Sequence, residues 1–379
     1  MKRKAKKKEM RQYIAMAFQL VLGAGCGLVI AGFLDTLDWG MSPGKTLMAC
    51  GVVFLALYAA MAVQILIHES GHLVFGLLSG YRFCSFRAFS FMWLKEDGHI
   101  RMRKFSLPGT GGQCLMSPPD MKDGKLPVAL YNLGGSLMNL FSALVCGLLS
   151  LAFGGSPVIS GIALIFAVIG CMFAIVNGVP MRMGTVDNDG YNAYALSRNP
   201  EALRAFWVQL KVNEQIGKGV RLKDMPDKWF AVPGDAAMKN SMVATLGVFA
   251  CNRLMDAHRF PEADSLMAHM LEMDSGMVGL HRNLLICDRI YGELIGENRR
   301  EVLDAMVTKE QKKFMKQMKD YPGVLRTAYA LALLGERDAA KAEAIRERFA
   351  ARARTYPYPS EIQSEQELMQ IAGALPTGS

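Results

Sequence analysis

The sequence predicts an all-α membrane protein, with four transmembrane helices and a membrane-associated β-hairpin, joined to a soluble domain of α-helical hairpins. Three observations predict this class. Hydrophobic residues make up 51% of the 379 residues, and the long apolar runs 52–67, 128–153 and 158–179 all lie before residue 190. With their flanking residues, these runs are long enough to form membrane helices. The long segment between the first two runs, residues 81–126, is basic, and the second half of the chain has the amphipathic periodicity of soluble helices.

The chain begins with a basic segment, residues 1–11, which is followed by an apolar segment at about 13–33. The apolar segment is too long for the hydrophobic region of a signal peptide, and no small-x-small cleavage site follows it. Gly23 stands where a lipoprotein signal ending at Cys26 requires an aliphatic residue. We therefore expect a short cytoplasmic tail and a first transmembrane helix.

A second helix is expected at about 45–79, which at ~1.5 Å per residue is longer than the ~30 Å hydrocarbon core of a membrane. The region 81–126 that follows is polar, and its first ten residues alternate aromatic with small or charged side chains. This period near two predicts a β-hairpin, with Asp97-Gly98 as a turn within it. Residues 108–112 are rich in glycine but lack the Gly-Lys-Ser/Thr ending of a phosphate-binding loop, so we interpret them as a flexible loop.

Two more helices are expected at 127–153 and 157–180, so the membrane domain covers residues 12–195. Residues 1–190 carry 17 Lys and Arg against 10 Asp and Glu, whereas the remainder carries 26 against 24. The basic segments fall on one side of the four spans, which predicts a multi-pass protein of a bacterial plasma membrane with both termini cytoplasmic. The lipid bilayer is the expected surrounding. No basic stripe with interleaved aromatics is present, which argues against nucleic acid as a partner.

Residues 196–379 predict a cytosolic domain of short amphipathic helices, and we expect it to bind a protein partner or to recruit substrate. The expected helices are two within 242–273, then 277–294, 301–318, 324–334 and 338–354. Two prolines after Tyr356 predict a frayed end. Segments 254–268 and 333–349 share a leucine, a polar turn and an alanine-rich helix, and so resemble tetratricopeptide-type hairpins. A non-repeating helical bundle is the alternative. The eight cysteines form no Cys-x-x-Cys pair, which favours reduced, structural residues.

The motif His68-Glu69-Ser70-Gly71-His72 lies near the end of the second expected helix. On a helix, two histidines four residues apart lie on one face and can share a Zn²⁺ ion, while the glutamate between them acts on a metal-bound water. Ionisable side chains are costly in a membrane-length apolar segment, which favours a functional role over a structural helix end. His68 and His72 are therefore the candidate metal ligands, and Glu69 is the candidate general base.

A catalytic zinc site needs a third protein ligand. The four other histidines lie outside the expected transmembrane helices, so a carboxylate is the better candidate. Pro180 can break the fourth helix, and Asn177 can bind backbone groups that this break leaves free. The chain beyond could then fold Asp189 back toward the second helix, although Asp187, two residues away, stays open as an alternative.

Together these motifs resemble the site-2 protease family of intramembrane zinc metalloproteases. The resemblance is carried by the His-Glu-x-x-His motif, by Asn177-x-x-Pro180 with Asp189-Gly190, and by residues 134–139, which are similar to the family's small-residue motif ending in asparagine. It covers about residues 45–195. The gap before Asp189 is longer than in the commonest form of the family, Gly135-Ser136 stands in place of Gly-Pro, and no PDZ-like insertion is present.

The resemblance implies a zinc ion held by His68, His72 and Asp189, since Asp-Gly is the family pairing and favours Asp189 over Asp187. It also implies that the hairpin pairs with an extended substrate segment. For Asn139 it implies a contact with substrate, with hydrogen bonding between helices as the structural alternative.

The resulting hypothesis is a zinc metalloendopeptidase that cleaves membrane-spanning or membrane-inserted peptides, with a zinc-bound water as nucleophile and Glu69 as base and then acid. The alternative is a non-catalytic membrane scaffold whose helical tail binds partners. A transporter is disfavoured, because the four expected helices show no internal repeat and no charge pair at their middle.

Overall fold

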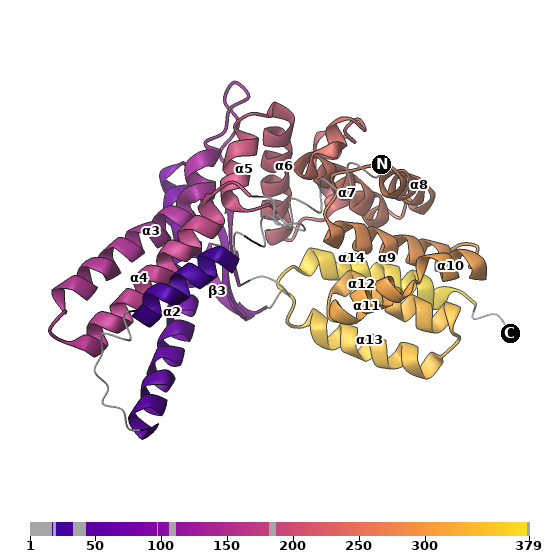
Figure 1. Cartoon of the computed structure of the whole chain (residues 1–379). Helices are drawn as coiled ribbons and strands as arrows, with labels where there is room; N and C mark the ends of the chain where they lie inside the picture. Colours follow the sequence, from indigo (N-terminus) through magenta and orange to yellow (C-terminus); the bar gives the residue numbers. More distant parts are fainter. Residues whose placement is uncertain are drawn as a thin grey trace. The chain divides into compact units, whose positions relative to one another are not determined.

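The computed structural model describes residue 17 and residues 20–32, 43–96, 98–105, 111–181 and 187–376. The protein is 71% helical and has a small sheet of four strands (Figure 1). It divides into two compact units. The first contains Met1–Ala88, Gly111–Pro119 and Lys125–Asn199, and the second contains Phe89–Thr110, Asp120–Gly124 and Pro200–Ser379. The predicted fold class is confirmed at this level, as a mostly helical chain with long apolar helices and a small sheet.

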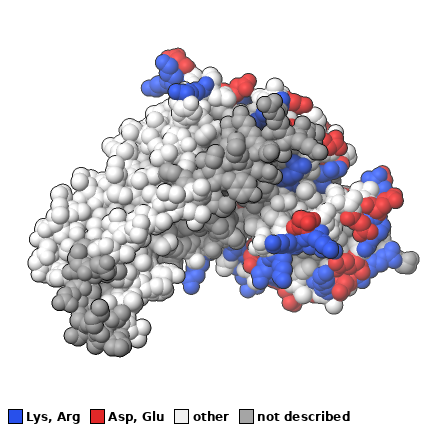
Figure 2. Space-filling view, in the orientation of Figure 1, with Lys and Arg blue, Asp and Glu red and all other residues white. Residues whose placement is uncertain are grey.

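Three helices of the first unit are long and apolar enough to cross a membrane: α2 (Pro43–Leu78), α3 (Val128–Ala152) and α4 (Pro157–Gly178). They agree with three of the expected spans to within two residues. Lys45 and Glu69 are their only Lys, Arg, Asp or Glu residues. On the face drawn in Figure 2 the bundle surface is accordingly uncharged, whereas blue and red side chains gather over the helices of the second unit. Of the first expected span, Leu20–Gly32 is a shorter apolar helix, and the rest lies outside the described residues.

The three long helices pack against one another in pairs. Small residues allow this close approach, because a Cβ added at Gly71 of α2 would lie 2.3 Å from the carbonyl oxygen of Gly134 on α3. Large apolar side chains on the outer faces, such as Phe54, Leu144 and Ile159, are exposed. That pattern is expected of helices surrounded by lipid, while α2 and α3 bury polar side chains such as His68, His72 and Asn139, which can form a site.

The strands form two antiparallel pairs: β1 (Arg82–Ala88) with β4 (Gly112–Ser117), and β2 (Phe91–Glu96) with β3 (His99–Lys104). The second pair confirms the predicted hairpin, since Glu96 lies opposite His99 and Gly98 in the turn has φ +82°. The sequence interpretation was wrong about Gly112, which begins strand β4 and does not end a flexible loop. Residues 108–110 of the expected loop lie outside the described residues.

The second unit is built from short helices that pack in succession (Figure 1). They are α6 (Pro200–Gly217), α7 (Ser241–Asp256), α8 (Phe260–Glu272), α9 (Gly279–Ile295), α10 (Arg300–Met306), α11 (Lys309–Gln317), α12 (Pro322–Ala330), α13 (Ala339–Ala353) and α14 (Pro359–Ala374). The helix expected at 301–318 is two helices, because the Thr308 hydroxyl accepts the Gln311 N–H and caps α11.

The expectation that the chain frays after Tyr356 was wrong. Pro359 lies at the start of α14, where a missing N–H costs no helical hydrogen bond. Leu368 and Ala372 then enter the same core as Leu285 and Tyr291. The helix is therefore held by packing, which outweighs the two prolines that suggested disorder.

Candidate metal centre

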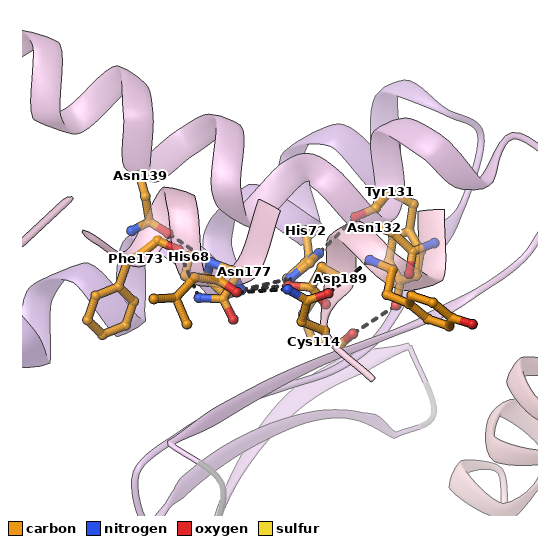
Figure 3. Close-up of polar contacts among 12 residues, drawn as sticks. His68, His72, Cys114, Tyr131, Asn132, Asn139, Phe173, Asn177 and Asp189 are labelled. Carbon is orange, nitrogen blue, oxygen red and sulfur yellow. Dashed lines mark hydrogen bonds and ion pairs between the residues drawn. The ribbon is translucent and has the colours of Figure 1, made fainter. Parts of the chain in front are cut away.

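His68 and His72 lie one turn apart near the end of α2 and point to the same side of the helix (Figure 3). Their rings are nearly perpendicular, with centroids 4.8 Å apart, and the two Nε2 atoms are separated by 3.2 Å. Both residues are buried, at 8% and 9% exposed. The four-residue spacing thus brings two imidazole nitrogens together inside the helix bundle.

Asp189 reaches this point because the chain turns back after α4. The helix ends at Gly178, before Pro180, and α5 (Asp189–Leu196) begins eleven residues after Gly178. The backbones of α4 and α5 touch, since a Cβ added at Gly190 would lie 2.1 Å from the Gly178 carbonyl oxygen. Glycine at position 190 is what lets Asp189 come close to the bundle.

The side chain of Asn188 fastens this turn. It caps α5 and makes four hydrogen bonds to backbone groups on both sides of the turn. Its Oδ1 accepts from the N–H groups of Tyr191 (2.9 Å) and Met181 (3.0 Å), and its Nδ2 donates to the carbonyls of Val176 (2.8 Å) and Val179 (2.6 Å). The position of Asp189 is therefore fixed by the residue directly before it.

The Oδ2 atom of Asp189 lies 3.0 Å from Nε2 of His68 and 3.4 Å from Nε2 of His72. His68, His72 and Asp189 form the one group of candidate metal ligands found among the described residues, and Asp187 is not part of it.

The other nitrogen of each ring faces a fixed acceptor. Nδ1 of His72 lies 2.8 Å from the backbone carbonyl of Tyr131, and Nδ1 of His68 lies 2.7 Å from Oδ1 of Asn139 (Figure 3). The amide nitrogen of Asn139 donates to the carbonyl oxygen of Gln64 (2.9 Å) and to its Oε1 (2.7 Å), which leaves Oδ1 for the histidine. Since carbonyl oxygens only accept, both Nδ1 atoms carry the hydrogen.

This assignment leaves three acceptors facing one another. In the neutral rings both Nε2 atoms present lone pairs, and the third atom is a carboxylate oxygen of Asp189. Buried acceptors this close repel unless a proton or a cation lies among them. Ligands ~2.0 Å from a tetrahedral ion are about 3.3 Å from each other, and the three observed separations run from 3.0 to 3.4 Å. The three ligand atoms therefore fit around a divalent cation of the size of zinc.

Glu69 lies beside this group and is half-buried. Its carboxylate makes no hydrogen bond to another residue in the described part of the chain, so it is available to a proton. Strand β4 runs directly against it, since a Cβ added at Gly112 would lie 2.5 Å from Oε1 of Glu69. The buried guanidinium of Arg87 donates to the Gly112 carbonyl at 3.1 Å and holds the strand there.

The two other predicted site residues, Asn177 and Pro180, do not belong to the group of candidate metal ligands. Asn177 donates to the Phe173 carbonyl at 3.0 Å, one turn back in its own helix, and Pro180 follows the end of α4. The sequence interpretation missed Gln64 and Asn188. Both left a signal: Gln64 is a polar residue one turn before His68 in an apolar run, and Asn188 is a helix cap directly before Asp-Gly.

Comparison of the chain with protein-family models, with curated proteins and with solved structures finds no match. The function is therefore inferred from the chemistry of the site itself.

Proposed function

We propose that the protein is an intramembrane zinc endopeptidase of the site-2 protease type. One observation carries the proposal. Three acceptor atoms of His68, His72 and Asp189 converge at the separations that a tetrahedral ion requires, and Glu69 beside them has no hydrogen-bond partner among the described residues. Few other chemistries call for this set at the end of an apolar helix.

Each residue has a separate role. His68, His72 and Asp189 hold the ion. A bound zinc ion supplies Lewis-acid polarisation of a peptide carbonyl and lowers the pKa of its water toward ~7. Glu69 takes a proton from the attacking water and passes it to the leaving amine. Asn139 acts as a positioning residue, since its side chain makes hydrogen bonds to His68 and Gln64.

The proposed substrate is a membrane-spanning or membrane-inserted peptide. At ~1.5 Å per residue, His68 lies about 30 Å along the helix from Leu47, which is about the thickness of the hydrocarbon core. The site is therefore near one membrane boundary, which we take to be the cytoplasmic one, in a bacterial plasma membrane. A substrate segment must unwind before its amide reaches the ion, and β4, an outer strand of the sheet beside Glu69, offers a backbone for it to pair with. The second unit would recruit substrate or a protein partner.

Metal analysis and peptide hydrolysis test the proposal together. The purified chain is expected to hold one zinc and to cleave a membrane peptide reconstituted with it. Glu69→Gln should keep the zinc and lose activity by about 10²–10⁴-fold, because it removes only the proton carrier. Glu343→Gln makes the same change at an exposed position and should change neither. Equal hydrolysis by the wild type and Glu69→Gln contradicts the proposal, and a chain without zinc favours the membrane scaffold instead.

A further inference from the structure

A cavity of about 120 Å³ lies within the second unit, among helices α7, α9, α12 and α14. Six side chains with full charges line it, and four of them are acidic. They are Arg221, Asp256, Asp288, Arg326, Glu361 and Glu365. With all six ionised the lining carries a net charge of −2, so the cavity favours a cation over an anion.

Both arginines are already occupied by carboxylates. Arg326, whose side chain is 2% exposed, donates to Asp288 and, from Nε at 2.9 Å, to Glu365. Arg221, at 6% exposed, donates to Asp256 and Glu367. Each guanidinium therefore faces two acids, and neither is left over to bind a phosphate or a carboxylate from solution.

Glu361 is different, because no basic side chain in the described part of the chain pairs with it. Its carboxylate accepts one hydrogen bond, from the Tyr356 hydroxyl at 2.7 Å. Burial, with a smaller contribution from Glu365, raises the pKa of Glu361 to about 7. Beside it, Ser360 is 5% exposed, and its hydroxyl has no hydrogen-bond partner among the described residues. A half-buried carboxylate and a buried hydroxyl thus remain for a ligand that brings donors.

The rest of the lining combines polar residues, such as Asn252 and Ser364, with apolar ones. Met255, Leu284 and Leu368 contribute to the wall beside the carboxylates. A cation with a short apolar stem matches this mixture, because the stem can pack against the wall while the head reaches the acids. A hydrated inorganic ion matches it less well, since three of the four acids in the lining already pair with arginines and only Glu361 is left to bind it.

We propose that this cavity binds a primary alkylammonium group on a short aliphatic stem, with the ammonium donating to Glu361 and Ser360. The same chemistry is carried by a lysine side chain in a peptide and by a free alkylamine. Its compact head suits a cavity of this size better than a planar guanidinium. The site is distinct from the metal centre and does not depend on peptidase activity.

Calorimetric titration of the full chain in detergent tests the site. The probes are an end-blocked Gly-Gly-Lys-Gly-Gly peptide, the same peptide with norleucine in place of lysine, and n-butylamine. The lysine peptide is expected to bind at least about tenfold more tightly than the norleucine peptide, since only the cation gains a charged hydrogen bond. Binding of n-butylamine as tightly as the lysine peptide identifies a small-amine site, and weaker binding identifies a peptide site.

Two variants locate the binding. Glu361→Gln and Ser360→Ala should each weaken the lysine peptide by about tenfold, whereas Glu343→Gln, with the same loss of charge at an exposed position, should not. Tryptophan fluorescence checks that the variants are folded. If Glu361→Gln does not fold, the wild-type comparison of lysine with norleucine and the Ser360→Ala variant still decide. Equal binding of both peptides, no binding of either cation, or wild-type affinity in folded Glu361→Gln or in Ser360→Ala overturns the proposal.

Discussion

The two units treat buried polar groups in opposite ways. In the second unit each buried cation faces acids, as Arg326 faces Asp288 and Glu365. In the first unit His68, His72 and Asp189 bring three acceptors together, and their Nδ1 partners prevent the rings from turning to donate. The buried arginines in the second unit are balanced by acids within the chain. The three acceptors in the first unit have no donor from the described residues among them. Opposite charges in contact serve structure, whereas the converging acceptors form a group that could hold a cation.

The largest effect is expected from removing one of the three acceptors. Asp189→Asn replaces a charged oxygen by a neutral one, so zinc content and peptide hydrolysis should both fall by more than the roughly 100-fold that an outer partner costs. Asp187→Asn is the matched control, since Asp187 lies outside the ligand group. Zinc is measured by atomic absorption after dialysis. Loss of zinc in Asp187→Asn but not in Asp189→Asn would show that the third ligand is Asp187 and not Asp189.

The second unit offers the reverse experiment, in which a cation is removed from between acids. Arg326→Met leaves Asp288 and Glu365 buried without their partner, and the free energy of unfolding should fall by about 3–5 kcal/mol. Chemical unfolding can be followed by tryptophan fluorescence, because Trp93, Trp207 and Trp229 all lie in this unit. Arg346→Met removes an exposed arginine from a pair within one helix and should cause no measurable change. If Arg326→Met left the unfolding midpoint unchanged, the ion pairs of Arg326 with Asp288 and Glu365 would not contribute to stability.

The pH dependence of the same unit follows from Glu361. Because burial raises its pKa from about 4.5 to about 7, the folded state binds more protons than the unfolded state between these values. Stability should therefore fall as pH rises from about 4.5 to about 7, by at most about 3 kcal/mol. Glu361→Gln, which cannot ionise, should flatten this part of the profile. Parallel profiles for the two proteins would place the titration on another group.

The grouping of His68, His72 and Asp189 was predictable, because these residues stand in patterns of known physical meaning. The four-residue spacing of His68 and His72 gives one helix face, and Pro180 marks where α4 ends. Residues that act through those ligands were harder to predict. Gln64 and Asn188 bond to groups 75 and 12 residues away, respectively, and such pairing depends on how helices pack. Position in the sequence alone does not reveal it.

The fold shows the same division. Helices α2, α3 and α4 were located closely because long apolar runs dominate any other signal. Strand β4 was missed, since its partner β1 lies some thirty residues earlier and the glycine-rich sequence around Gly112 is typical of a loop. Helix α14 was missed for a related reason: local prolines suggested fraying, while its burial against distant helices decides the outcome. Long-range contacts are what the sequence pattern leaves out.

The substitution with the smallest expected effect gives the sharpest test of the metal centre in the first unit, because it removes no charge and no metal ligand. Asn139→Ala removes the acceptor that holds Nδ1–H of His68, so the ring can adopt the other tautomer or rotate. Zinc affinity should fall by about 10–100-fold, the usual cost of losing an outer partner of a metal ligand. Activity at saturating zinc should recover in part, since Glu69 and the three ligand atoms remain.

Asn177→Ala makes the same substitution on a neighbouring helix, where the lost bond runs only to the Phe173 carbonyl. It should leave zinc affinity unchanged in a competition titration against a chelator. If Asn139→Ala instead raised the KM for the membrane peptide with zinc affinity intact, Asn139 would contact substrate and the three acceptors would be held by the helix bundle alone. The two readouts thus separate a residue that orients a ligand from one that binds the substrate.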